Sequence, residues 1–170
     1  MRRFLIVDGY NIIGDWPELR ELQTRNLEEA RDILIEKMAE YQAYTGASVI
    51  IVFDAHMVPG LGRKMKNFRL DIIYTREKET ADERIEKLVR TLKRVDTEIS
   101  VATSDFLEQR VIFASGALRK SARELRNEVM AIEKRISRKV MNAKKHKGRS
   151  KLPITDEMAE IFEKWRRGER

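Results

Sequence analysis

Three aspartates stand where their carboxylates could act together. Asp8 and Asp105 each follow an apolar run, and Asp82 lies in the first turn of an expected helix. Carboxylates gathered at one place repel one another unless a cation lies among them. With no histidine or cysteine nearby, such oxygen ligands suit Mg²⁺ or Mn²⁺. The sequence therefore predicts a magnesium or manganese site made by these three side chains.

A metal site of this kind suits cleavage of a phosphodiester by in-line attack of water. The metal lowers the pKa of the water and neutralises the charge that develops on the phosphate oxygens. Asn11 is expected to position a ligand or the scissile phosphate through its side-chain amide. Glu83 and Glu86 follow Asp82 on the same expected helix and are secondary candidates for metal binding.

Each aspartate also has a purely structural explanation. Asp8 is followed by glycine in a common turn pair, Asp82 suits the N-terminus of a helix, and Asp105 can cap the next helix. Taken singly, these explanations are the simpler ones. Taken together at one edge of a sheet, the three carboxylates favour a site.

The elements that must position these side chains alternate between strands and helices. Strands are expected at 3–7, 48–53, 68–74 and 98–102, with the one at 68–74 more exposed than the buried strands at 3–7 and 48–53, and a short edge strand is expected at 117–120. Helices are expected at 27–45, from 80 to about 92, after 105 through 113, from 121 to about 140, and from 155 to near 167. Basic loops are expected at 55–67 and 142–153.

This alternation predicts an α/β fold, with a central, mostly parallel sheet flanked by helices in three layers. Ligands of open parallel sheets bind outside the carboxyl ends of the strands. A buried parallel strand does not turn straight back as a hairpin, so Asp8 is expected at this ligand-binding edge.

The composition restricts the class of protein. Charged residues make up 37% of the 170 residues, against about a quarter in an average domain, while apolar residues are spread along most of the chain. The chain has no cysteine, which excludes disulfides and thiolate metal sites. No apolar stretch is long enough to cross a bilayer. We therefore expect a cytoplasmic protein without a membrane partner.

The basic charge is concentrated in the C-terminal third. Residues 117–170 contain 17 Lys and Arg against 8 Asp and Glu, a net charge of +9, whereas the preceding residues carry a net charge of −2. No acidic residue lies between Lys134 and Thr155. A block of this kind favours a polyanionic partner, above all nucleic acid, although basic tails also occur only for solubility.

Several motifs in this order resemble the NYN-domain branch of the PIN-like nuclease fold. They are VDGYNII, VFDA, ADERIE and ATSD, and the stretch GALRKSAREL narrows the resemblance to the bacterial YacP family. The resemblance covers Phe4 to about Glu128 and implies a nuclease domain over residues 1–130. Residues 131–170 are then expected to form a basic helical extension.

The resemblance implies a metal-dependent endoribonuclease that cleaves single-stranded RNA, with a link to ribosome-associated cleavage of mRNA. It places Asp8, Asp82 and Asp105 as catalytic metal ligands and Asn11 in the same site. PIN-like nucleases often have a fourth acid, which no motif here supplies. The candidates for that position are Glu83, Glu86 and Asp54.

Basic residues along the chain are expected to bind the RNA. They are Arg63, Lys64, Lys66, Ser115 (a polar neighbour), Arg119, Lys120, Arg123, Lys144, Lys145, Lys147 and Arg149. The last four form a diffuse patch that suits ribosomal RNA or long RNA better than base reading. Trp16, Tyr10 and Phe68 are candidates for stacking on bases, although single aromatics beside strands more often belong to the core.

Two other functions remain open at this stage. One is a non-catalytic RNA-binding or ribosome-binding module that keeps the acidic pocket as a relic. The other is a PIN-like nuclease directed at DNA, for which the chain is short because such enzymes carry additional helical elements. Cleavage that stops on addition of EDTA, and a parallel panel of RNA and DNA substrates, separate these functions from the first.

Overall fold

The computed structural model describes residues 1–55, 69–149 and 156–168. They form five strands and seven helices, and the α/β fold expected from the alternation is confirmed. The strands are β1 (Arg2–Asp8), β2 (Ser48–Phe53), β3 (Asp71–Tyr74), β4 (Thr97–Ala102) and β5 (Leu118–Lys120). The helices are α1 (Gly9–Asp15), α2 (Pro17–Gln23), α3 (Leu27–Thr45), α4 (Ala81–Leu92), α5 (Phe106–Ala114), α6 (Ala122–Arg149) and α7 (Asp156–Arg166).

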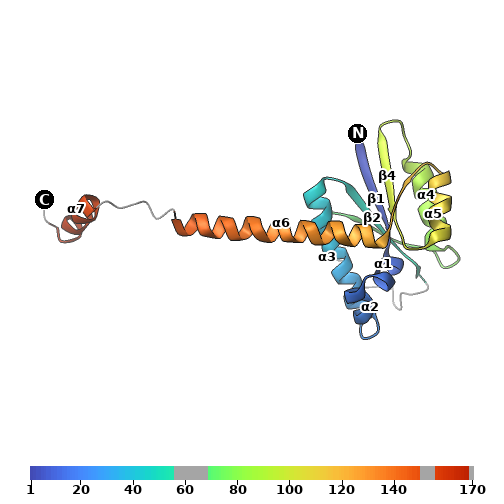
Figure 1. Cartoon of the computed structure of the whole chain (residues 1–170), viewed down its shortest axis with the longest axis horizontal. Helices are drawn as coiled ribbons and strands as arrows, with labels where there is room; N and C mark the ends of the chain where they lie inside the picture. The colour runs from blue at the N-terminus through green and yellow to red at the C-terminus, as the bar shows by residue number, and fades with distance from the viewer. Residues whose placement is uncertain (56–68, 150–155, 169–170) are drawn as a thin grey trace. The chain divides into compact units, whose positions relative to one another are not determined.

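The strands form one parallel sheet in the order β3-β2-β1-β4-β5. The first strand therefore lies in the middle, and its carboxyl end faces the start of α4 and α5. Side chains alternate between the two faces of a strand. On one face, Ile6, Val52 and Val101 pack with Ile85 of α4 and Ile112 of α5. These two helices lie side by side on that face (Figure 1).

The segment after β1 turns directly into a helix, which the sequence analysis did not predict. Helix α1 begins at Gly9, immediately after Asp8, and buries Ile12 and Ile13. A Cβ atom on Gly9 would lie 2.3 Å from the Phe53 ring, so only glycine allows this close packing. The apolar pair Ile12 and Ile13 is too short for a helical period to be recognised in the sequence.

Helix α6 is longer than expected. The sequence analysis ends this helix near residue 140 and places a basic loop at 142–153, but α6 continues through Arg149. That prediction was wrong because Lys, Arg and Ala are good helix formers even where no apolar stripe marks the helix. Strand β3 also begins at Asp71 rather than at Phe68, which lies outside the described residues.

The chain divides into two compact units, Met1–Ile132 and Glu133–Arg170. Unit 1 contains the sheet, and α6 contributes residues to both units. Among the described helices, none combines the length and the apolar character needed to cross a bilayer.

Candidate metal centre

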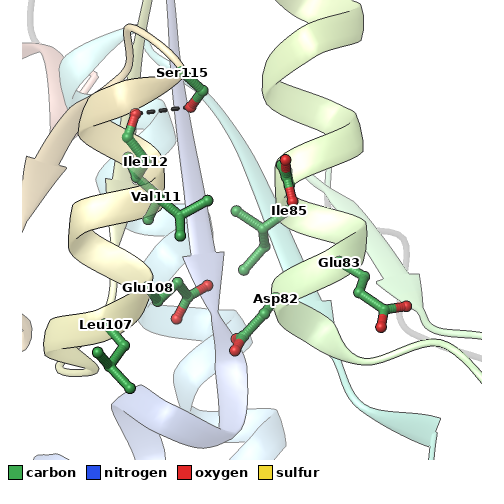
Figure 2. A pocket seen from close by; sticks show the side chains of 9 residues that line it. Asp82, Glu83, Ile85, Leu107, Glu108, Val111, Ile112 and Ser115 are labelled. Atoms are coloured by element: carbon green, nitrogen blue, oxygen red, sulfur yellow. Dashed lines mark hydrogen bonds between the residues drawn. The ribbon is translucent and has the colours of Figure 1, made fainter.

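Three carboxylates from three elements meet at the carboxyl end of β1. Asp8 is the last residue of this strand, Asp82 lies in the first turn of α4, and Glu108 lies in the first turn of α5. One carboxylate oxygen of each lies within 4.8 Å of the other two. Figure 2 shows Asp82 and Glu108 pointing toward one another between the two helices. We call Asp8, Asp82 and Glu108 the carboxylate cluster.

Two members of the cluster are buried, and the third opens it to solvent. Asp8 and Glu108 are only 7% and 6% exposed, whereas Asp82 is exposed. The Thr103 hydroxyl donates to Glu108 Oε2 at 2.7 Å. The other oxygen, Glu108 Oε1, is buried without a hydrogen-bond partner within the described part of the chain. A buried carboxylate oxygen left without a donor is costly in a protein unless a cation or a proton meets it.

The electrostatics of the cluster disfavour three separate negative charges. Burial, and then the charge of Asp82, raise the pKa of Asp8 to about 6. Burial, and then the charge of Asp8, raise the pKa of Glu108 to about 9. Burial is also the main cause that raises the pKa of Asp82. A divalent cation among these oxygens would offset the repulsion, so the donor set fits Mg²⁺ or Mn²⁺.

Helix capping holds the acidic first turns in place. The Thr80 hydroxyl oxygen accepts a hydrogen bond from the Glu83 N–H at 3.2 Å and caps α4. Asp105 caps α5, because its Oδ1 accepts from the Leu107 N–H at 2.9 Å. These caps fix the start of each helix, and with it the positions of Asp82 and Glu108.

Asn11 connects the two sides of the site. Its side-chain oxygen accepts from both the N–H and the hydroxyl of Ser104, the latter at 2.7 Å. Its backbone N–H donates to the Asp8 carboxylate, which lowers the pKa of Asp8 against the larger effect of burial. Asn11 thus ties α1 to the connection between β4 and α5.

Comparisons with known proteins now decide the family. A profile of the YacP-like NYN domain matches residues 5–167. The chain belongs to the YacP-like NYN domain family. The resemblance described from the sequence motifs is thereby confirmed, and the family is nuclease-like.

Individual relatives of this YacP-like NYN protein agree with the profile. It is 57% identical, over 97% of both chains, to the uncharacterized protein YacP of Bacillus subtilis (strain 168). It is similar to the crystal structure of Rae1 (YacP) from Bacillus subtilis, with a TM-score of 0.79 and 57% identity, covering 97% of this chain and 95% of that one. A tryptophan-to-leucine mutant of Rae1 matches with a TM-score of 0.73 and 54% identity, over 93% and 89% of the two chains.

The YacP-like NYN site differs in composition from the set that the sequence analysis proposed. Asp8 and Asp82 do come together, but Asp105 uses Oδ1 to cap α5 and is not part of the cluster. Its charge still raises the pKa of Asp82, after the larger effect of burial. Glu108 takes the third place in the cluster.

Glu108 is the acid that sequence reasoning missed. It stands three residues after Asp105, where an acid in the first turn of a helix is easily attributed to capping or to the helix dipole. One signal was available in the printed sequence. Asp82 and Glu108 occupy the same place, the first turn of a helix that follows a strand of the sheet.

The secondary acidic candidates lie around the cluster rather than in it. Glu83 and Glu86 line a cavity of approximately 180 Å³ between α4 and α5, and Glu86 forms an ion pair with Arg90. Asp54, after the end of β2, lies near enough for its charge to raise the pKa of Asp82, after the larger effect of burial. None of the three belongs to the cluster that the described residues form.

Some of the predicted RNA-binding residues are occupied by structural contacts. Lys120 donates to Glu128 at 2.8 Å and to the Tyr41 hydroxyl at 3.3 Å. Burial alone would lower the pKa of Lys120, but the hydrogen bond to Glu128 and the charges around it raise the pKa overall. The Ser115 hydroxyl donates to the backbone oxygen of Ile112, at the end of the α4–α5 cavity far from Glu108 (Figure 2).

The other basic residues lie in different parts of the chain, and Arg119 is on β5, where it donates to Gln109. Arg123 is exposed near the start of α6, and Lys144, Lys145 and Lys147 are exposed on the part of α6 that belongs to unit 2. Arg149 is the last residue of α6. The predicted contacts from Arg63, Lys64 and Lys66 lie outside the described residues.

One proposed stacking residue proves to be part of the core. Trp16 is only 1% exposed, and its indole N–H donates to the backbone oxygen of Ala122 at 2.8 Å. Tyr10 is half-buried and packs against Phe53, and its hydroxyl accepts from Arg31. Trp16 is therefore not available to stack on bases, and the core position that is more usual for a single aromatic beside a strand is confirmed.

Proposed function

We propose that this YacP-like NYN protein is a metal-dependent endoribonuclease that cleaves single-stranded RNA, mRNA among its substrates. The observation that carries the proposal is the carboxylate cluster, in which oxygens of Asp8, Asp82 and Glu108 from three elements lie within 4.8 Å of one another. Three elements place acids at the one edge of a parallel sheet where ligands bind. Membership of a nuclease-like family supports phosphodiester cleavage as the reaction.

Asp8, Asp82 and Glu108 would hold Mg²⁺ or Mn²⁺ in this protein. When bound, the ion supplies Lewis-acid catalysis and an activated water for in-line hydrolysis of the phosphodiester. Asp8 and Glu108 are buried and positioned, so little reorganisation is needed on binding. Asp82 lies at the exposed side of the cluster, where the RNA strand would approach.

The remaining residues of the site keep this arrangement rigid. The Thr103 hydroxyl donates to one oxygen of Glu108 and so fixes the orientation of its carboxyl group toward Asp8 and Asp82. Asn11 holds the loop at Ser104, and Asp105 holds the first turn of α5. The N-termini of α4 and α5 both point toward the cluster, and their dipoles favour the phosphate that must enter beside the acids.

We also propose that the basic C-terminal third binds RNA outside the catalytic site, ribosomal RNA included. Exposed Lys144, Lys145 and Lys147 on α6 support this role. Such contacts recognise phosphates rather than bases, so they would add affinity that falls with salt concentration.

The decisive experiment measures cleavage of an mRNA fragment and of the equivalent single-stranded DNA, with and without ribosomes. We expect Mg²⁺-dependent or Mn²⁺-dependent cleavage of RNA that EDTA abolishes and that Asp8→Asn removes. A Glu86→Gln variant serves as the matched control, since Glu86 is an acid beside the cluster but not in it. Cleavage that persists in EDTA would contradict the metal mechanism, and equal cleavage of DNA would contradict the RNA assignment.

Absence of cleavage under all these conditions, with RNA binding intact, would favour the non-catalytic RNA-binding module instead. In that case Asp8→Asn should change neither binding nor any other property that depends on RNA.

A further inference from the structure

Helix α5 carries a second hollow on the side that faces away from the carboxylate cluster. This cavity of approximately 370 Å³ is lined by Phe106, Gln109, Arg110, Phe113 and Arg119. Successive residues of a helix are rotated by 100°, so Phe106, Arg110 and Phe113 share one side, and Glu108 and Ile112 share the other. We call Phe106, Arg110, Phe113 and Arg119 the aromatic–arginine face.

The two phenylalanine rings of this face are unusually open to solvent. Phe106 is 66% exposed and Phe113 is 74% exposed. They stand seven residues apart, which separates them by roughly 10 Å along the helix. Neither ring contributes to the core of unit 1, so the stability of the fold does not explain their presence.

Two arginines accompany the rings. Arg110 lies one turn after Phe106 on the same side of α5, and Arg119 comes from β5. Arg119 Nη1 donates to Gln109 Oε1 at 2.8 Å, and Gln109 Nε2 donates to the backbone oxygen of Thr103 at 2.9 Å. Gln109 is 7% exposed, so this buried amide anchors Arg119 to the end of β4 and holds its guanidinium beside the rings.

We propose that the aromatic–arginine face binds single-stranded RNA, with bases stacked on Phe106 and Phe113 and phosphates contacted by Arg110 and Arg119. This inference rests on the proposed function and adds to it the surface that holds the substrate. Open aromatic rings next to cations are the usual platform for unpaired bases, because every base has a face that can stack. The cavity is lined by two cations and no acid, which complements a polyanion.

The face begins at the N-terminus of α5, the end of the helix that also carries Glu108. Phe106 is the first residue of α5, next to its cap Asp105 and two residues before Glu108. A strand whose scissile phosphate lies at the cluster can therefore pass over the start of α5 and reach Phe106. A stacked strand advances about 3.4 Å per nucleotide, so the distance between the rings corresponds to about three such steps.

The test measures binding in EDTA, where metal-dependent cleavage is absent. The probes are a fluorescent 12-nucleotide oligo(A) RNA and a matched abasic oligonucleotide with the same number of phosphates, and the readout is fluorescence anisotropy. We expect the double variant Phe106→Leu, Phe113→Leu to bind oligo(A) at least about tenfold more weakly than the unaltered protein. The abasic probe should bind both proteins weakly and equally.

Phe113→Tyr is the matched control, because it keeps the ring. We expect it to bind within about twofold of the unaltered protein, whereas Phe113→Leu, which keeps apolar area without the ring, should bind more weakly. The substitutions fall on exposed side chains, so unchanged melting temperatures should accompany these results.

Equal binding of oligo(A) by the double variant and by the unaltered protein would overturn the proposal. So would a concentration-dependent dimer that the double variant loses, because the rings would then serve contact between copies of the chain. Neither result depends on cleavage. A protein that binds RNA through these rings but never cleaves it would refute the proposed function and leave this inference intact.

Discussion

The two sides of α5 present opposite kinds of side chain from residues only one or two positions apart. Toward α4, the helix presents buried Glu108 and the apolar side chains of Val111 and Ile112. Away from α4, it presents exposed Phe106 and Phe113 together with Arg110, and Arg119 of β5 lies beside them. The first side has oxygen ligands and suits a cation, whereas the second has cations and rings and suits a nucleic acid strand.

If the two proposed roles are correct, one short helix separates catalysis from substrate binding. Burial strengthens the electrostatics of the carboxylate cluster and keeps its geometry rigid. Exposure leaves the rings of the aromatic–arginine face accessible to bases. If the contrast holds, substitutions on one side should change cleavage and substitutions on the other should change affinity.

The largest effect is expected from Glu108→Gln. This change keeps the shape of the side chain but removes the charge that a divalent cation requires, so cleavage should fall by at least about 100-fold. RNA binding in EDTA should stay within about twofold. Initial cleavage rates and fluorescence anisotropy measure the two quantities. A cleavage rate equal to that of the unaltered protein would show that Glu108 is not a metal ligand.

Asp105 provides a sharper test, because different substitutions distinguish a role in capping α5 from a role in binding the metal. Asparagine and serine cap helices about as well as aspartate, whereas alanine loses roughly 1 kcal/mol. We expect Asp105→Asn to keep most of the cleavage and stability, and Asp105→Ala to lose stability and about tenfold in rate. Thermal melting and cleavage assays give the comparison. If Asp105→Asn were as inactive as Glu108→Gln, Asp105 would be a metal ligand after all.

A smaller effect is expected from Arg119→Gln on the other side of α5. Loss of one phosphate contact should weaken RNA binding several-fold and reduce the slope of log affinity against log salt concentration by about 0.7. Arg25→Gln, an exposed residue in the connection between α2 and α3, is the matched control and should leave the slope unchanged. The measurement is an anisotropy titration at several salt concentrations. If Arg119→Gln and Arg25→Gln gave the same salt-dependence slope, Arg119 would not contact the RNA.

A separate test concerns the stability of the carboxylate cluster in the absence of metal. The folded-state pKa values of Asp8 and Glu108, about 6 and about 9, lie above the ordinary values of 3.8 and 4.5. The folded protein therefore binds more protons than the unfolded chain between about pH 4 and pH 9, and its stability should fall as the pH rises through that window.

Melting temperatures in EDTA measure this effect, at roughly 2–4 °C for each kcal/mol. Glu108→Gln should flatten the upper part of the profile, and added Mg²⁺ or Mn²⁺ should raise the melting temperature most at high pH, where the cluster is ionised. A profile for Glu108→Gln that matches the unaltered protein would show that the cluster does not set the pH dependence.

The accuracy of the sequence analysis varied with the kind of signal available. Strong local signals gave correct elements, such as α3 between its cap Asn26 and Gly46 with a φ of 73°. Weak periodicity hid α1 and α2, and the low apolar content after Val140 hid the last turns of α6. In each missed case, helix propensity or tertiary packing acted without an apolar stripe to reveal it.

The amino-acid sequence by itself determined the parallel α/β fold, the family, and the placement of Asp8 and Asp82 at one edge of the sheet. Periodicity, capping residues and motif order carry that information because they depend on neighbours along the chain. Only the tertiary structure decided that Glu108 rather than Asp105 completes the cluster, and that Phe106 and Phe113 stand exposed beside Arg119. Those outcomes depend on which side of α5 packs against α4, and that packing is set by contacts between segments distant in sequence.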